Sequence, residues 1–436
     1  MINTGQKILK KAKKIIPGGN QLLSKRSEII LPKLWPNYYK KAKDCRVWDL
    51  DNKCYYDFAG MGVTSCILGY ANKELNTAIK KAVDESGMCT LNAVEEYQLA
   101  KKLTNIHRWA DMAKFCKSGG EACLVAIRIA RAFTKKEKIA FCGYHGWHDW
   151  YLAANMSNKR SLDKQLLKGL STKGISSSYN NSIFPFNYNN IDSLKKIINK
   201  NKKELGIIIM EPMRGVLPEK NFLKQVRKIA TKNNIILIFD EITSGFHDVY
   251  GGIHLRFKVN PDLAIFGKSL GNGFPISSII GKKKIMDASQ ETFISSTMWT
   301  DKLGFVAANK TLEILKKRKI NKKLEKYGKL IKKSWTNIAK LYGIEIKIFG
   351  QNSMPGFTFI NNDHLLLSTF FSQEMLKRGF LANTTITMTD AYNLKIIKKY
   401  LKVFSLVFKE IKKSLKKNKI NLKYSVKHET FQRLTG

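Results

Sequence analysis

Lys268 stands where lysine is uncommon, one glycine after the apolar run 263–266, which has the length and composition of a buried strand. A lysine at the end of such a strand is partly desolvated, so its amine can lose a proton and attack an aldehyde. Asp240 ends a second apolar run in the same way. A carboxylate there is costly to bury unless a cation such as a protonated ring nitrogen pairs with it. A surface lysine and a structural ion pair are the ordinary alternatives.

Two further stretches contain groups suited to anions and aromatic rings. Ser118, Gly119 and Gly120 lie between a strand pattern and a helical pattern, so their N–H groups would meet a phosphate at a helix N-terminus. Tyr144 and His145, in "YHGWHDWY", follow another apolar run, and an aromatic side chain there could stack on a flat ring. Taken alone, the first stretch is a weak signal, since an ordinary strand-to-helix turn has the same residues. The second, taken alone, is better explained as an aromatic cluster in the core or at its rim.

Together these groups specify one kind of ligand. The helix N-terminus suits a phosphate, Tyr144 a ring face, Asp240 a ring nitrogen and Lys268 an aldehyde. A phosphorylated aromatic aldehyde with a protonatable ring nitrogen describes pyridoxal phosphate. We therefore expect Lys268 and Asp240 to be catalytic residues that act with this cofactor.

The elements that position these residues alternate between helical patterns and short apolar runs such as "KIAFC" and "ELGIIIM". This alternation predicts an α/β fold with a mostly parallel sheet between helices, in which ligands bind at the carboxyl ends of the strands. We expect three parts. Residues 1–60 form an N-terminal segment and hairpin that packs with the small domain, 61–305 a large cofactor-binding domain, and 306–436 a smaller α+β domain.

Composition narrows the possible partners. The formal net charge of +43 is typical of nucleic-acid binding, but only 12 of the 77 basic residues are arginine and the lysines recur along whole helices. We therefore expect solvated lysine-rich faces and no nucleic-acid partner. The apolar runs are too short to cross a membrane. The seven cysteines form no CxxC pair, which predicts reduced thiols, a cytoplasmic location and no metal site.

Several motifs carry a resemblance to a known family, from about residue 17 to about residue 389. The chain resembles the class III aminotransferases of pyridoxal-phosphate fold type I, and within them the branch similar to glutamate-1-semialdehyde aminomutase. The motifs are "PGG" (17–19), "SGGEA" (118–122), "YHGWHD" (144–149), "FDEITSGFH" (239–247), "PDLAIFGKSLGNGFP" (261–275) and "SSTMWT" (295–300).

The resemblance implies roles for single residues. Lys268 would be the Schiff-base lysine, Asp240 the partner of the ring nitrogen, and Gly119 and Gly120 part of the phosphate site. Thr297 would be a phosphate ligand that the second subunit supplies, so the resemblance also implies a homodimer with shared active sites.

A further residue and the departures from the family pattern bear on specificity. The resemblance places Glu211 near the ring and its substrate side. Ser244 and His247 replace the family's usual threonine and arginine, and Arg26 matches only loosely the arginine of the aminomutase N-terminal motif. Arg214 could bind an anionic substrate group or form a structural ion pair.

The predicted reaction is ping-pong transamination between a small-molecule amino donor and a carbonyl acceptor. An intramolecular aminomutase would use the same residues and is the first alternative. A basic nucleic-acid or scaffold protein that retains the fold is the second.

Overall fold

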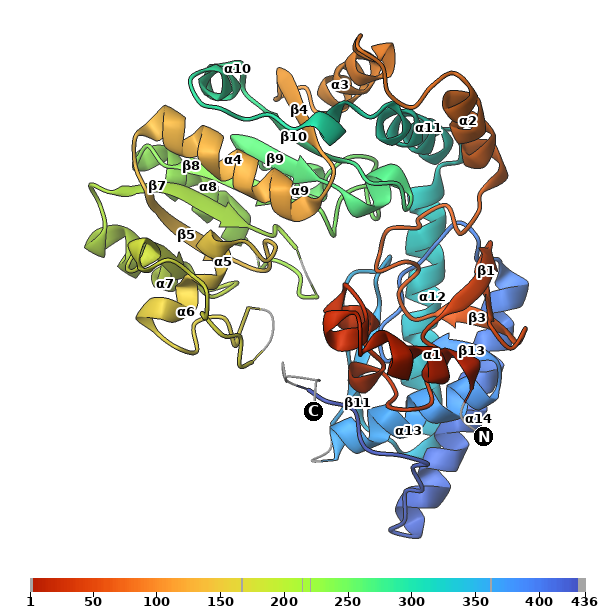
Figure 1. Ribbon diagram of the computed structural model, residues 1–436. Coiled ribbons are helices and arrows are strands. Elements are labelled where there is room, and N and C mark those ends of the chain that lie inside the picture. Colours follow the sequence, from red (N-terminus) through yellow and green to blue (C-terminus); the bar gives the residue numbers. More distant parts are fainter. Residues whose placement is uncertain (1–2, 166–167, 214, 220, 361–362, 430–436) are drawn as a thin grey trace. The chain divides into compact units, whose positions relative to one another are not determined.

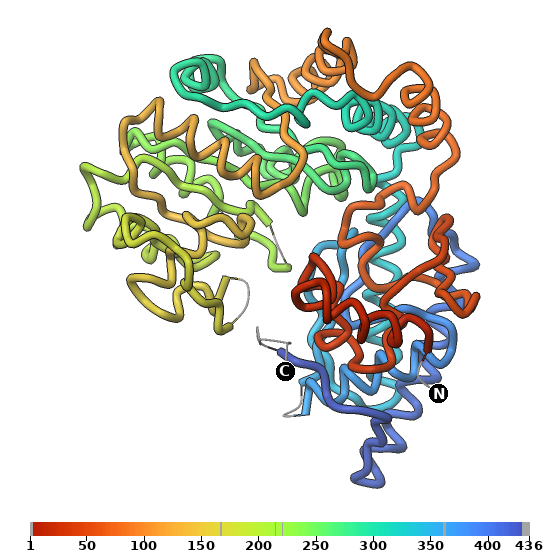
Figure 2. The backbone as a smooth tube through the Cα atoms, in the orientation of Figure 1, coloured from red at the N-terminus to blue at the C-terminus, as the bar shows by residue number. Residues whose placement is uncertain are grey.

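The structure is a computed structural model (Figure 1). It describes all of the chain except residues 1–2, 166–167, 214, 220, 361–362 and 430–436. Arg214 therefore lies outside the described residues. The chain forms two compact units, Lys73–Asn321 and Met1–Asn72 with Lys322–Gly436. Figure 2 shows the same division, with the red and blue ends of the chain in one unit and the middle in the other.

The larger unit contains, among its described residues, a seven-stranded sheet with the order β4-β10-β9-β8-β7-β5-β6. The strands from β6 to β9 run parallel to one another, whereas β10 is antiparallel to both of its neighbours. This confirms the predicted α/β fold with a mostly parallel sheet. The bounds are β4 Met112–Cys116, β5 Lys138–Cys142, β6 Ile183–Pro185, β7 Leu205–Met210, β8 Ile236–Asp240, β9 Leu263–Phe266 and β10 Ser277–Gly281.

Helices bury both faces of this sheet, which is why its central strands are continuously apolar. Successive side chains of a strand point to opposite faces. In β7, Ile207 and Ile209 pack in the core that includes α4, whereas Ile208 and Met210 pack in the core that includes α7 and α8. The helices of this unit are α2 Lys73–Asp84, α3 Val94–Ile106, α4 Gly119–Thr134, α5 Asp149–Leu152, α6 Ala154–Ser157, α7 Ile191–Lys200, α8 Phe222–Lys232, α9 His254–Phe257, α10 Lys283–Met286 and α11 Lys302–Arg318.

The position of α11 sets the end of the larger unit. This helix packs against α2, α3 and the 3-10 turn η5, Lys268–Gly271. Its buried Ala307 packs in one apolar cluster with Leu75 and Ile79 of α2, so the unit continues to Asn321. The boundaries expected from the sequence are 60/61 and 305/306, whereas the two compact units meet along the chain at 72/73 and 321/322.

The smaller unit is an α+β structure around an aromatic core. A four-stranded sheet, with the order β1-β2-β3-β13, lies among its described residues. Phe58, Phe404, Tyr400 and Trp335 are among the fully buried aromatic residues of the core. Its elements are α1 Thr4–Ala12, β1 Tyr39–Lys43, β2 Arg46–Asp49, β3 Cys54–Phe58, α12 Ile320–Tyr342, β11 Ile346–Phe349, β12 Gly356–Phe359, α13 His364–Lys377, β13 Phe380–Ala382 and α14 Leu394–Lys416. No helix in the described part of the chain has both the length and the apolar character needed to cross a membrane.

Candidate active site

Asp240 and Lys268 lie at the same edge of the sheet, because each follows the carboxyl end of one of two neighbouring parallel strands. Asp240 is the last residue of β8 and pairs with Ile265 of β9. Lys268 follows β9 and opens the turn η5, where its φ of 42° lies in the left-handed region. Residues with a Cβ adopt this region at a cost of roughly 1–2 kcal/mol, and such strain concentrates at functional sites. The structure thus places both proposed catalytic residues where α/β folds bind ligands.

Thr243 is a site residue that the sequence analysis missed. The Lys268 ammonium donates a hydrogen bond to Thr243 Oγ1 over 2.8 Å. Thr243 stands three residues after Asp240 in "FDEITSGFH", in the loop that follows β8. The only signal in the sequence is a hydroxyl in a loop at the correct edge of the sheet, which is too common to identify a residue.

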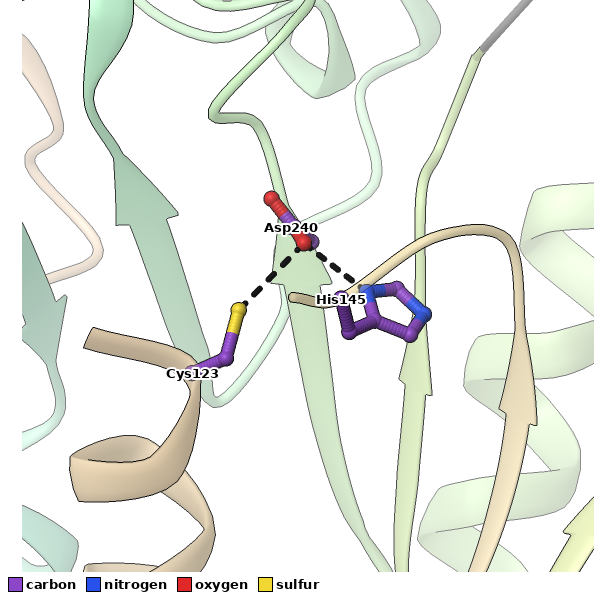
Figure 3. Close-up of side chains that lie close together, drawn as sticks. All are labelled: Cys123, His145 and Asp240. Atoms are coloured by element: carbon purple, nitrogen blue, oxygen red, sulfur yellow. Dashed lines mark hydrogen bonds and ion pairs between the residues drawn. The ribbon is translucent and has the colours of Figure 1, made fainter. Parts of the chain in front are cut away.

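Asp240 lies in a buried shell of hydrogen-bond donors (Figure 3), and its side chain is only 2% exposed. Its Oδ2 atom is 2.8 Å from His145 Nδ1 and 3.4 Å from Cys123 Sγ, while Oδ1 accepts from the Ile242 N–H over 3.0 Å. His145 Nε2 also lies 3.2 Å from the Cys142 carbonyl oxygen, which can only accept. His145 can therefore bond to both oxygens only while both ring nitrogens carry a hydrogen.

The same three residues, Cys123, His145 and Asp240, bring potential metal-ligand atoms within 4.8 Å of one another. No local sequence pattern indicates this cluster, because its members come from α4, the loop after β5, and β8. A metal would need the Cys123 thiolate. Burial, followed by the nearby Asp240 charge, raises the pKa of the Cys123 thiol well above its ordinary value. The cluster is thus better suited to hold a carboxylate by hydrogen bonds than to bind a metal.

The N-terminus of α4 presents two N–H groups for an anion. Ser118 caps the helix: its Oγ accepts from the Glu121 N–H, while Glu121 Oε2 accepts from the N–H groups of Ser118 and Lys117. This capping box leaves the Gly119 and Gly120 N–H groups without an acceptor among the described residues. The Ser118 hydroxyl donates to Glu121, so in this structure it serves the cap.

Close side-chain neighbours leave little room for a residue larger than glycine at both of these positions. A Cβ on Gly119 would lie 2.7 Å from Ile242 Cδ1, and one on Gly120 would lie 2.9 Å from His148 Cε1. The helix dipole also favours an anion at this end. Two unpaired N–H groups, a buried carboxylate and a lysine at neighbouring strand ends fit the phosphate, ring nitrogen and aldehyde of pyridoxal phosphate.

Glu211 shapes the turn that carries Tyr144. This carboxylate directly follows β7, is 4% exposed, and accepts from the Tyr144 N–H over 2.9 Å. Gly143 has a φ of 111°, and a Cβ there would lie 2.6 Å from Glu211 Oε2. The half-buried Tyr144 ring meets the Tyr151 ring edge-on at a centroid distance of 5.8 Å. The observed contact of Glu211 is therefore with the backbone of the predicted ring-stacking residue.

Thr297 lies on an exposed segment of the larger unit. Residues 295–298 are all exposed, and the nearby side chains of Phe293 and Met298 are 83% and 60% exposed. Trp299 anchors the segment to α4, because its Nε1 donates to Glu121 Oε1 over 3.3 Å. The segment is thus attached to the helix whose N-terminus forms the anion site, while Thr297 faces outward.

Glu241 organises a second buried network directly behind Asp240. One of its oxygens accepts from the N–H and Nδ1 of His254, and the other from the Ile253 N–H and the Ser244 hydroxyl. Ser244 therefore keeps the hydroxyl of the threonine that the family usually has at this position. His247 is fully buried, and its carbonyl oxygen accepts from Asn321. These contacts hold the loop that carries Thr243.

His107 extends this network and makes stability depend on pH. Its Nδ1 lies 3.0 Å from the Leu103 carbonyl oxygen, and its Nε2 accepts from the Gly252 N–H. Burial, reinforced by His254, lowers the pKa of His107 to about 4. The unfolded chain, with an ordinary histidine pKa near ~6.5, binds this proton first. We expect the contribution of His107 to the free energy of unfolding to be constant above that value and to fall by roughly 3 kcal/mol as the pH drops to about 4.

Urea unfolding from pH 7 to pH 4 measures this dependence. His107→Gln keeps one donor and one acceptor but cannot take up a proton. In this range the variant should show a shallower loss of stability than the unmodified protein. Equal slopes for the two proteins would show that other groups cause the acid sensitivity.

Comparisons with known proteins agree with this geometry. The family model for aminotransferase class-III matches residues 33–413. A 3-aminobutyryl-CoA aminotransferase of Cloacimonas acidaminovorans is 34% identical over 81% of this chain and 82% of its own length. A glutamate-1-semialdehyde 2,1-aminomutase of Nitrosopumilus maritimus is 32% identical over 92% of this chain and 98% of its own.

Solved structures show the same fold at lower identity. The FumI protein of Sphingopyxis sp. MTA144 superposes with a TM-score of 0.86 at 23% identity, covering 95% of this chain and 98% of its own. An omega-transaminase from Sphaerobacter thermophilus superposes with a TM-score of 0.84 at 21% identity, covering 93% and 97%. The expected fold type, enzyme class and cofactor are confirmed: this chain belongs to the class III aminotransferase family and is a pyridoxal-phosphate-dependent aminotransferase.

Proposed function

We propose that the enzyme is a transaminase that moves an amino group from a donor to a separate carbonyl acceptor by a ping-pong mechanism. The observation that carries this proposal is the meeting of Asp240, Lys268 and the two Gly N–H groups of α4 around one edge of the sheet. When bound, pyridoxal phosphate supplies an electron sink that stabilises negative charge on the carbon bearing the amino group.

Each residue of this site has a distinct task in the proposal. The Gly119 and Gly120 N–H groups bind the phosphate. Asp240 keeps a proton on the ring nitrogen, and Lys268 Nζ carries a proton away from the amino-bearing carbon of the donor and returns one to the acceptor. Thr243 Oγ1 orients Lys268 Nζ through the hydrogen bond between them.

A matrix of amino donors and carbonyl acceptors tests the proposal. It should include 3-aminobutyryl-CoA, common amino acids and β-amino acids as donors, with pyruvate, 2-oxoglutarate and keto-sugars as acceptors. A ping-pong enzyme gives parallel double-reciprocal plots when both substrates are varied. Intersecting plots for an active pair would contradict the mechanism, and absence of turnover with every pair would contradict the assignment as a two-substrate transaminase.

An intramolecular aminomutase is the second candidate, and Arg26 favours it. This side chain packs against Gly18, and its Nε is buried without a partner among the described residues. A guanidinium held in this way can bind a substrate carboxylate. Isomerisation of glutamate-1-semialdehyde with no added acceptor, together with a raised KM in Arg26→Gln, would favour the aminomutase over the transaminase.

We further propose that two subunits share each site, with Thr297 of one chain binding the phosphate held by the other. The exposed apolar side chains of Phe293 and Met298 beside Thr297 support a contact with a second copy. A two-fold dimer is the simplest closed assembly of this kind. Cofactor binding and dimerisation would then be linked, because a ligand that binds only the dimer stabilises it.

Mixing two inactive variants tests this arrangement. In a mixed dimer of Lys268→Ala and Thr297→Glu chains, one site contains both defects and the other contains neither. Activity should return after subunit exchange, to about a quarter of the activity of the unmodified enzyme if chains pair at random. Mixed dimers without activity, or an active species that sediments as a monomer, would contradict the shared site.

The seven cysteines are free thiols, and five of them are buried. This supports the proposal that the enzyme works in the reducing environment of the cytoplasm. The net charge of +43 would favour the approach of anionic donors and acceptors.

A further inference from the structure

Cys123 is the one buried side chain of α4 that can donate a hydrogen bond toward the sheet. The other fully buried side chains of this helix are alanine, valine and isoleucine. Cys123 is itself 0% exposed, and its Sγ lies 3.4 Å from Asp240 Oδ2 although the two residues are 117 positions apart. The thiol therefore reaches the catalytic carboxylate from a helix that otherwise contributes only apolar packing.

The donors around Asp240 are unevenly divided between its two oxygens. Cys123 and His145 both bond to Oδ2, and they approach it from different sides (Figure 3). Oδ1 has one bond, from the Ile242 N–H. A carboxylate offers about four acceptor positions, so Oδ2 is saturated while Oδ1 retains one.

We infer that Cys123 is a positioning residue that, together with His145, fixes the orientation of the Asp240 carboxylate and reserves Oδ1 for the ring nitrogen of the cofactor. The inference rests on the proposed role of Asp240. Burial and the Asp240 charge raise the pKa of the thiol, so Cys123 stays an S–H donor and is a poor nucleophile. Its effect on the reaction therefore passes through the carboxylate.

The test compares two buried thiols of the same core. Cys116 is also 0% exposed and belongs to the same core cluster, but no hydrogen bond joins it to Asp240 among the described residues. Cys116→Ala and Cys123→Ala therefore remove the same atoms from similar surroundings, and only the second removes a donor to the carboxylate. Cys123→Ser restores a donor at the same position.

Three measurements on the purified protein give the result. They are the Kd for pyridoxal phosphate, the visible circular dichroism per mole of bound cofactor, and the melting temperature of the cofactor-free protein. Cys123→Ala should weaken cofactor binding about fivefold to tenfold, the size expected for the loss of one ordinary hydrogen bond, because a thiol is a weak donor. It should also reduce the visible circular dichroism, because the ring is less firmly oriented.

The serine and control variants decide the interpretation. Cys123→Ser should recover most of the affinity and dichroism, and Cys116→Ala should change each by less than about twofold. Equal effects of the two alanine variants, or a serine variant as weak as Cys123→Ala, would reduce Cys123 to a packing role and overturn the inference. A protein that binds no pyridoxal phosphate even when unmodified would instead refute the proposed site as a whole.

Discussion

Lys268→Ala is expected to give a folded protein with no measurable turnover, from which pyridoxal phosphate can be dialysed. Lys268 follows the carboxyl end of β9 at the sheet edge beside Asp240. Its amine is the expected Schiff-base nitrogen, and in our proposal it also moves the proton. Alanine can do neither. Because proton transfer and covalent attachment are both lost, the rate should fall by at least about 10⁴-fold.

Borohydride reduction followed by peptide mapping measures the attachment directly. In the unmodified enzyme the label should lie on the peptide that contains Lys268, and in the variant no lysine should carry it. Lys258→Ala is a matched control, because Lys258 is exposed and also has a positive φ, of 52°. Full activity in Lys268→Ala, or a reducible adduct on another lysine, would show that Lys268 has been misassigned.

Asp240→Asn is expected to retain cofactor but to lose about 10²–10³ of the rate, equivalent to ~3–4 kcal/mol of transition-state stabilisation. An amide has no charge with which to keep the ring nitrogen protonated, so the ring withdraws electrons poorly. Cys123, His145 and Ile242 each direct a hydrogen-bond donor at this side chain. The amide also replaces one of the two accepting oxygens with an N–H₂ group, which cannot accept from them.

A second buried aspartate serves as a control, because it separates the effect of losing a buried charge from the loss of a catalytic group. Asp262 is 6% exposed and pairs with Arg227 and Lys282 just before β9, at the opposite end from Lys268. Asp262→Asn should lower the melting temperature and leave kcat nearly unchanged, whereas Asp240→Asn should lower kcat far more than the loss of a buried charge does at Asp262. Near-normal kcat in Asp240→Asn would rule out its proposed role.

Local sequence patterns predicted those parts of the fold that depend on neighbouring residues. The apolar runs at 236–240 and 263–266 are strands because both of their faces are buried, and their ends locate Asp240 and Lys268. The hairpin expected within residues 1–60 is formed by β2 and β3, which pair antiparallel. In each case, the pattern and the structure it predicts lie within one short segment.

Local sequence patterns do not predict contacts between residues that are far apart in the chain. Cys123 looks like an ordinary apolar helix residue until the sheet brings Asp240 against it, and Thr243 looks like any loop hydroxyl until Lys268 reaches it. The boundary after α11 was similarly hidden, because helical periodicity shows that a helix has an apolar face but not which unit covers that face. Such assignments require the three-dimensional packing.

The adjacent carboxylates at the end of β8 make this strand unusually intolerant of length changes. Asp240 points toward Cys123 of α4, whereas Glu241 binds His254 and Ser244 in the network that holds the next loop. Deleting one residue upstream within β8 would turn each of these side chains to the opposite face of the sheet. The aspartate would then lie on the side of the His254 and Ser244 network, and the glutamate would take the place of Asp240 beside Cys123. Insertions and deletions in this gene should therefore accumulate in the surface loops and be absent from the codons of β8, even where conservative substitutions are tolerated.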